Sequence, residues 1–108
     1  MRRRAVIYAR SATGESDAIK RQVGACKAYC LERGYSITED QIYSEIAVGT
    51  IETDSPELAR LRKVAQQGLI DVLILASRDR LTRHIWKNAL LTEQFKQLGI
   101  DIEIVDEQ

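Results

Sequence analysis

Apolar residues in this chain occur in two patterns, short continuous runs and longer stretches in which they recur every three or four positions. The continuous runs are Ala5–Ala9 and Leu69–Ala76, the second with Asp71 near its start, and two further segments, Gln41–Glu45 and Ile100–Val105, also fit strands. Runs of this length are typical of strands that are buried on both faces of a sheet. The pattern therefore predicts four strands, with Leu69–Ala76, the most apolar, at the centre.

The periodic stretches predict three helices. The first begins at Ser16 or Asp17, ends at Gly34, and has the apolar positions Ile19, Val23, Cys26, Cys30 and Leu31. The second begins at Ser55-Pro56-Glu57, with Ser as the cap and Pro in the first turn, and ends at Gly68. Its buried positions should be Leu58, Leu61, Val64 and Ala65. The last helix runs from about Ile85 to Leu98 and ends at Gly99.

Strands and helices therefore alternate along the whole chain. This order predicts an α/β domain with an open, mainly parallel sheet of four or five strands and helices on both faces. A length of 108 residues is typical of one domain, so we expect residues 1–108 to form a single unit. In such sheets, ligands bind at the carboxyl ends of the strands.

Arginines and hydroxyl groups follow two of the predicted strands at this edge. Arg10 comes directly after the first strand, and Arg80 and Arg83 follow Leu69–Ala76. If the two strands are neighbours, the arginines converge, and their planar groups suit a phosphate because each donates two parallel hydrogen bonds. The alternative is that they are ordinary surface charges, one of them paired with Asp79.

The charge balance limits what this site can do alone. The chain has 16 basic and 16 acidic residues and a formal net charge of zero, whereas domains that bind DNA on their own are usually basic. Contact with nucleic acid must therefore come from the arginine cluster or from a part of the natural protein outside this sequence. The chain alone should bind duplex DNA poorly.

Several other kinds of site are excluded. The first strand is followed neither by Gly-x-Gly-x-x-Gly nor by a Gly-rich Lys-Ser/Thr loop, so we expect no nucleotide cofactor. A receiver domain would need acidic residues where Arg10 stands. Cys26 and Cys30 lack a second pair of ligands, and His84 is the sole histidine, so we predict no metal and interpret both thiols as buried and reduced. The apolar run after Met1–Arg4 is too short for a signal peptide or a membrane span, which predicts a cytoplasmic protein with no membrane partner.

Motifs at the strand ends resemble those of the N-terminal catalytic domain of serine site-specific recombinases, the resolvase/invertase family. Tyr8-Ala9-Arg10-Ser11-Ala12-Thr13 is similar to the family's Tyr-x-Arg-x-Ser-Thr opening. Asp79-Arg80-Leu81-Thr82-Arg83 matches its Asp-Arg-Leu-x-Arg element, the most specific of these matches. Ile19, Gln22 and Gly49 match further family positions, and the order and spacing hold across nearly the whole chain.

The resemblance implies DNA recombination without a metal or cofactor. In the family, a serine hydroxyl attacks a DNA phosphodiester, forms a phosphoserine link and releases a 3′ hydroxyl, and a tetramer then exchanges and reseals the strands. The implied roles place Arg10, Arg80 and Arg83 on the phosphate, where fixed donors stabilise the transition state. Asp79 would orient an arginine or help proton transfer, and Gln22 would support the loop. Tyr8 is assigned to packing.

Three positions depart from the family pattern. Ala12 stands at the position of the nucleophile, and the adjacent Ser11 should face the other side of the strand unless the strand has already ended. Glu45, a candidate for the phosphate side of the site, replaces an Asp. Ser55 replaces an arginine. Together these changes predict a naturally diverged copy with weak or absent cleavage.

The sequence ends just after its last predicted strand, without the dimerising helix and DNA-binding region that follow the family's catalytic domain. We interpret it as a fragment or a stand-alone relic. Double-stranded DNA would be bound through the full-length protein, as a homodimer or tetramer, with weak association of this chain alone. Two functions stay open, a recombinase catalytic domain and a non-catalytic module that keeps the fold to bind DNA or protein. They differ in whether Ser11 reaches the arginines.

Overall fold

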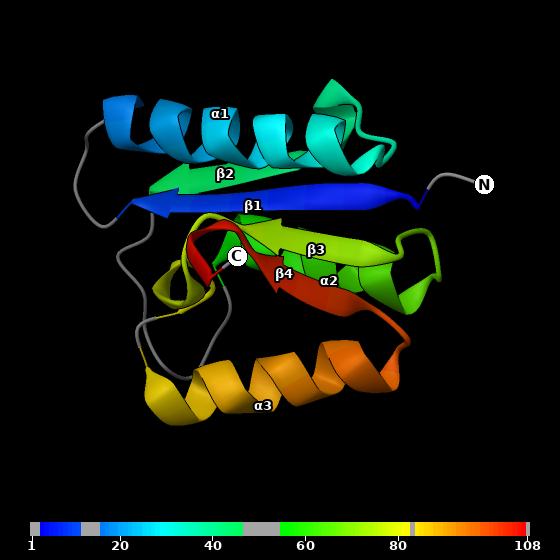
Figure 1. Cartoon of the computed structure of the whole chain (residues 1–108). Coiled ribbons are helices and arrows are strands. Elements are labelled where there is room, and N and C mark those ends of the chain that lie inside the picture. The colour runs from blue at the N-terminus through cyan, green and yellow to red at the C-terminus, as the bar shows by residue number, and fades with distance from the viewer. Residues whose placement is uncertain (1–2, 12–15, 47–54, 83, 108) are drawn as a thin grey trace.

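The computed structural model describes residues 3–11, 16–46, 55–82 and 84–107. Within them, one sheet contains the strands β1 (Ala5–Ser11), β2 (Ile42–Ile46), β3 (Val72–Leu75) and β4 (Asp101–Ile104). The strand order is β2-β1-β3-β4, and all neighbouring pairs are parallel. Figure 1 shows the four arrowheads at the same end of the sheet. The predicted α/β class and the open parallel sheet are confirmed.

Helices cover both faces of this sheet, as predicted. Helix α1 (Ser16–Arg33) lies over one face, and α2 (Pro56–Gln66) and α3 (Ile85–Gln97) lie over the other (Figure 1). Three short 3-10 helices follow strands or loops, and they are η1 (Glu39–Gln41), η2 (Arg78–Arg80) and η3 (Val105–Glu107). Of these, η2 matters for function because it directly follows the end of β3.

Strand β1 supplies side chains to two separate cores, one on each face of the sheet. Val6 and Tyr8 pack among residues of α2 and α3, whereas Ala5 and Ile7 pack with residues of α1. All four side chains are fully buried. This double burial explains why the first strand is a continuous apolar run rather than an alternating one.

The central strand is shorter than the sequence predicted. Helix α2 ends at Gln66, and Gly68, with a φ of 72°, turns the chain back toward the sheet. Leu69 follows this turn and is 49% exposed, and β3 begins only at Val72. The predicted strand Leu69–Ala76 therefore included the connection that leads into it.

The residues that helix α1 buries coincide only in part with its apolar positions. Leu31 is 83% exposed, while Gln22 and Tyr29 are buried together with Cys26 and Cys30. These four buried residues are four, three and one positions apart, which places them on a single face of the helix. Leu31 lies about 100° further round the helix axis than Cys30. Leu31 therefore lies outside the buried face although it is one of the apolar positions of the helix, because apolar character does not by itself decide which face a residue occupies.

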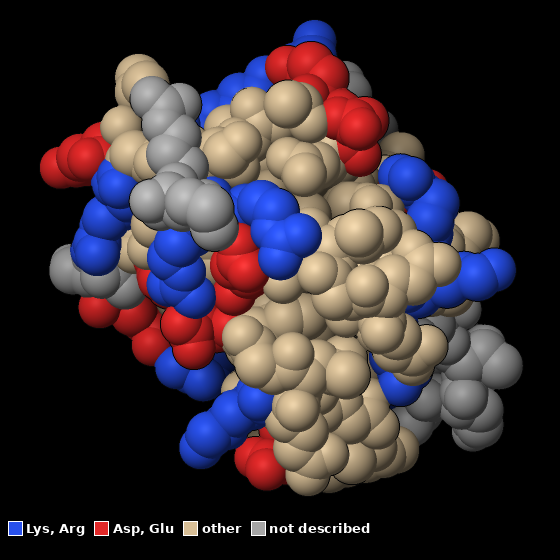
Figure 2. All heavy atoms as spheres, turned by 90° about the vertical axis from the view of Figure 1, so that its right-hand side faces the viewer, with Lys and Arg blue, Asp and Glu red and all other residues tan. Residues whose placement is uncertain are grey.

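Ion pairs join the elements at the end of the sheet where the strands begin. Arg3 pairs with Asp101 at 2.6 Å, and Arg4 pairs with Asp71 at 3.1 Å. Hydrogen bonds from Arg4 lower the pKa of Asp71 to about 2. Figure 2 shows this end of the molecule, where basic and acidic side chains are intermixed and form no single basic face.

Candidate phosphate-binding site

Two of the predicted arginines meet at the opposite end, where the strands finish. Arg10 is the last residue but one of β1, and Arg80 belongs to η2, just after β3. The Nη1 group of Arg80 donates a hydrogen bond of 3.2 Å to the main-chain oxygen of Arg10. They come together because β1 and β3 are parallel neighbours, so the segments that leave them emerge at the same edge.

Asp79 places a negative charge beside these arginines. The Ser77 hydroxyl donates a hydrogen bond of 2.7 Å to Asp79, and this bond is the largest cause that lowers the pKa of Asp79 from its usual value. Burial opposes it, and the charges of Arg80 and Arg10 lower the pKa further. Ser77 was missing from the predicted site residues, although a hydroxyl two positions before a carboxylate is a common turn pattern.

One donor of Arg80 is left without an acceptor. Its Nε atom is buried and, within the described residues, makes no hydrogen bond. Leaving a buried donor unpaired costs about 1–3 kcal/mol. Such groups are rare in native proteins and call for a cause, such as a role in catalysis or a bound ion or water. This cost marks Arg80 as a candidate for contact with a ligand.

Gln22 and Ser11 both lie on the α1 side of β1. The Gln22 amide accepts a hydrogen bond of 3.0 Å from the Arg10 N–H and donates one of 2.9 Å to the Arg10 carbonyl oxygen. Ser11 is 4% exposed and, by the alternation of side chains, shares its side of the strand with Ala5 and Ile7. The Ser11 hydroxyl therefore lies across the strand from the Arg10 side chain.

Glu45 is held by three donors of the protein. Tyr8 donates a hydrogen bond of 2.6 Å to it, the Ser55 hydroxyl donates a second, and the Glu57 N–H donates a third of 3.3 Å. Burial, and then the hydrogen bond with Glu45, raise the pKa of Tyr8. Ser55 occupies the N-cap position of α2, but its side chain makes no capping hydrogen bond. The predicted cap position of Ser55 is confirmed, but its hydroxyl binds Glu45, and the carboxylate of Glu45 accepts the hydrogen bond from the first turn of the helix instead.

Several predicted positions are not covered by the structure. Ala12, Thr13, Gly49 and Arg83 lie outside the described residues, so their placement stays a prediction. Among the residues that are described, no three His, Cys, Asp or Glu side chains form a group that could hold a metal ion. No helix in the same part of the chain is long and apolar enough to cross a membrane.

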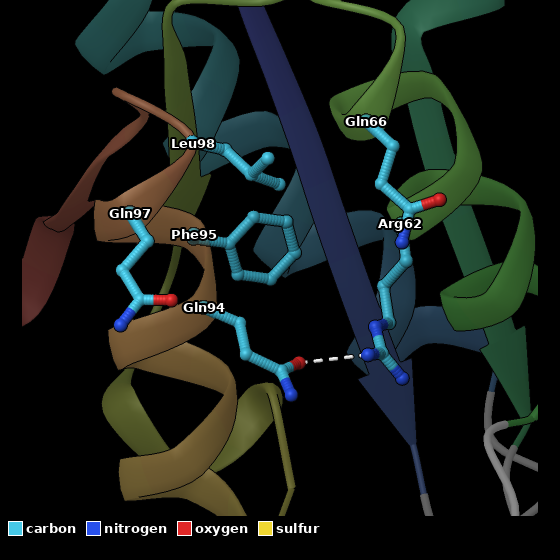
Figure 3. A pocket seen from close by; sticks show the side chains of 6 residues that line it. All are labelled: Arg62, Gln66, Gln94, Phe95, Gln97 and Leu98. Atoms are coloured by element: carbon cyan, nitrogen blue, oxygen red, sulfur yellow. Dashed lines mark hydrogen bonds between the residues drawn. The ribbon is translucent and has the colours of Figure 1, made fainter.

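Among the described residues, two hollows lie on the face of the sheet that α2 and α3 cover. One, of about 230 Å³, lies between α2 and α3 near their C-terminal ends, where Arg62 donates a hydrogen bond of 2.7 Å to Gln94 (Figure 3). The other, of about 540 Å³, runs along α3 from Arg78 and Asp79. Of these two, the second is lined by Asp79, on which the charges of Arg10 and Arg80 act, whereas the first lies at the end where the strands begin.

The family of the chain follows from sequence and fold together. Residues 5–108 match the model of the Resolvase, N terminal domain, family. The chain belongs to this family. The catalytic domain of ISC1926 TnpA, an IS607-like serine recombinase, is 31% identical, with a TM-score of 0.84 over 94% of this chain and 67% of that one.

Two more distant resolvase-type structures share the fold. The N-terminal catalytic domain of TP901-1 integrase is 23% identical, with a TM-score of 0.83 over 96% of this chain and 78% of that one. A resolvase family site-specific recombinase from Streptococcus pneumoniae is 14% identical, with a TM-score of 0.83 over 98% and 74%. None of the curated proteins matches the chain.

This resolvase-family domain keeps the arginines of the motifs but changes their surroundings. Ala12 stands where the resemblance places the serine nucleophile, and Ser55 stands where it places an arginine. Because Ser55 binds Glu45 at the start of α2, this position supports the helix and adds no positive charge. The domain therefore has Arg80 bonded to the main chain of Arg10, with an uncharged serine at position 55.

Proposed function

We propose that this chain is the catalytic-type domain of a serine site-specific DNA recombinase in which strand cleavage is weak or absent. Its substrate is the phosphodiester of duplex DNA, bound by Arg10, Arg80 and Arg83. The observation that carries the proposal is the hydrogen bond that joins Arg80 to Arg10 at the carboxyl ends of the strands, in a chain of the resolvase family. A guanidinium group suits a phosphate because it donates two parallel hydrogen bonds, and the charges of both Arg10 and Arg80 act on the same neighbour, Asp79.

The proposed loss of cleavage rests on the nucleophile. In cleavage of this kind a serine oxygen bonds to phosphorus, the 3′ oxygen leaves, and the proton of the serine passes to a base and on to the leaving group. Ala12 has no hydroxyl, and Ser11 lies on the α1 side of β1. Both features support a domain that binds phosphate without forming the covalent link.

The same features favour the second candidate function, a non-catalytic module that binds DNA or another protein. In either case we infer that residues 1–108 form one domain, that it acts in the cytoplasm as part of a homodimer or tetramer, and that it needs no metal or cofactor. The zero net charge supports the view that most of the affinity for DNA comes from other parts of the assembly.

Titration with inorganic phosphate tests the site, followed by NMR of the arginine Nε–H signals. We expect the signals of Arg10 and Arg80 to move together and to saturate. Arg80→Gln should abolish the response at Arg10, while the control Arg21→Gln, on an exposed face of α1, should keep it. Saturable binding that leaves both signals in place, or no binding at all, would contradict the proposal.

A further inference from the structure

Gln22 makes an unusual pair of contacts with the main chain of one residue. Its side chain is 6% exposed, and its amide bonds both the N–H and the C=O of Arg10, at 3.0 and 2.9 Å. A side-chain amide can do this because it carries a donor and an acceptor side by side, like a peptide group. The Gln22 amide therefore makes the two hydrogen bonds with the Arg10 main chain that a neighbouring strand would otherwise make.

The sheet leaves this place open. Strand β1 pairs with β2 as far as Ser11, but it pairs with β3 only over Ala5–Ile7. Beyond Ile7, no strand of the described part of the chain pairs with the edge of β1 that faces β3. Buried main-chain groups need partners, and the amide of Gln22 provides both for Arg10.

The same carbonyl oxygen also connects the two arginines. The oxygen of Arg10 accepts one hydrogen bond from Gln22 and another from Nη1 of Arg80. The direction of this oxygen therefore sets the position of the Arg80 guanidinium, and the direction of the Arg10 backbone sets the side from which the Arg10 side chain leaves the strand.

From this geometry we propose that Gln22 is a positioning residue, which holds Arg10 and Arg80 in one arrangement so that both donate to the same oxyanion. The identity of the ligand, an oxyanion, rests on the proposed function. The arrangement of Gln22, Arg10 and Arg80 does not. A purely structural Gln22 would instead attach α1 to the sheet and leave the arginines unaffected.

The variant Gln22→Met tests this role because it keeps the length of the side chain and removes both hydrogen bonds. Cys26→Ala is the matched control, since Cys26 is buried on the same face of α1 and packs in the core with Ala5 and Ile7. Two properties are measured by NMR, the mobility of the Arg80 Nε–H group from ¹⁵N relaxation and the dissociation constant of inorganic phosphate.

We expect Gln22→Met to raise the mobility of the Arg80 Nε–H group and to weaken phosphate binding about tenfold, as the loss of a supporting hydrogen bond does at metal-binding sites. Cys26→Ala should change neither, even if it lowers the unfolding temperature.

Each outcome decides the question. Unchanged Arg80 mobility in folded Gln22→Met would overturn the inference, as would equal changes in Cys26→Ala. If Gln22→Met does not fold, Gln22→Glu replaces it, at a pH where the carboxylate is ionised and cannot donate to the Arg10 carbonyl. If the unmodified chain binds no phosphate, the proposed function fails, while the mobility of Arg80 still decides the role of Gln22.

Discussion

The hydrogen-bond partners of Glu45 depend on which residue stands at position 55. Its carboxylate accepts hydrogen bonds from Tyr8, from Ser55 and from the N–H of Glu57 at the start of α2. An arginine at position 55 would bring a positive charge to the same place. With a serine there, the negative charge of Glu45 is stabilised by hydroxyl groups and by the positive end of the helix dipole. Glu45 thus serves the stability of α2.

Removal of the Ser55 hydroxyl should therefore destabilise the protein. We expect Ser55→Ala to lower the free energy of unfolding by about 1–3 kcal/mol, because a hydrogen bond to a charged group is lost. Urea denaturation followed by circular dichroism measures this, with the exposed Ser44→Ala on β2 as the control. An equal, small effect of both variants would show that the contact with Glu45 contributes nothing.

The nucleophile is the second question at the scale of single residues. In a chain joined to a working dimerisation helix and DNA-binding region, we expect the unmodified sequence to form little covalent adduct with a suicide DNA substrate. Ala12→Ser should recover some adduct because it restores a hydroxyl at the position of the nucleophile, although Ser55 still leaves the site one arginine short. A gel assay measures the adduct.

Ser11→Ala is the control for this assay. It should leave the low level of adduct unchanged, because Ser11 lies across the strand from Arg10. A strong adduct from the unmodified chain that disappears in Ser11→Ala would identify Ser11 as the nucleophile and would contradict impaired cleavage.

At the scale of elements, α3 separates core residues from apolar residues that merely lie on the surface. Leu91 and Phe95 are each 2% exposed, whereas Ile85 and Trp86, in the first turn, are 88% and 59% exposed. Lys87, between these two groups, is 8% exposed. The middle and end of the helix therefore attach it to the sheet, and its start projects beyond the core.

This division predicts opposite results for two aromatic residues of one helix. Phe95→Ala should lower the free energy of unfolding by about 3–5 kcal/mol, because it leaves a cavity in the core. Trp86→Ala should change it by no more than about 0.5 kcal/mol, the usual range for a surface substitution. Urea denaturation of both variants measures the difference, and a large loss in Trp86→Ala would contradict the division.

At the scale of the whole molecule, charges have different roles at the two ends of the sheet. Where the strands begin, Arg3 and Arg4 are neutralised by Asp101 and Asp71. Where they finish, Arg10 and Arg80 lie together, with Asp79 beside them. The formal net charge of zero thus conceals one end where Arg3 and Arg4 are ion-paired and another where Arg78 pairs with Glu107 and where we propose that Arg10 and Arg80 bind an anion.

The contact between Arg4 and Asp71, where the strands begin, should make the free energy of unfolding depend on pH. Hydrogen bonds from Arg4 lower the pKa of Asp71 from 3.8 to about 2, so folding favours the ionised carboxyl. This contribution is fully present above about pH 4 and is lost as the pH falls toward 2. We expect the stability advantage over Asp71→Asn to disappear across this range, measured by urea denaturation at several pH values. A constant difference between the two proteins would contradict the role of Arg4.

Much of the fold could be predicted from the sequence because its signals are local. A continuous apolar run indicates a strand that is buried on both faces, and the spacing of Leu58, Leu61 and Ala65 indicates one buried face of α2. The exposure of Leu31 and Leu69 could not be predicted, because it depends on how a helix is turned and where a connection ends. Those properties arise only when the elements pack.

The sequence by itself determined the α/β class, the order of the elements, and the position of Arg10, Asp79 and Arg80 near the carboxyl ends of strands, although Arg10 lies inside β1 and not after it as predicted. The tertiary structure decided the partners of these residues. The contacts of Arg80 with Arg10, of Gln22 with Arg10, and of Ser55 with Glu45 join segments 70, 12 and 10 positions apart. A hydrogen bond depends on distance and direction in space, and for such segments both are set by the pairing of strands and the packing of α1 and α2 on the sheet.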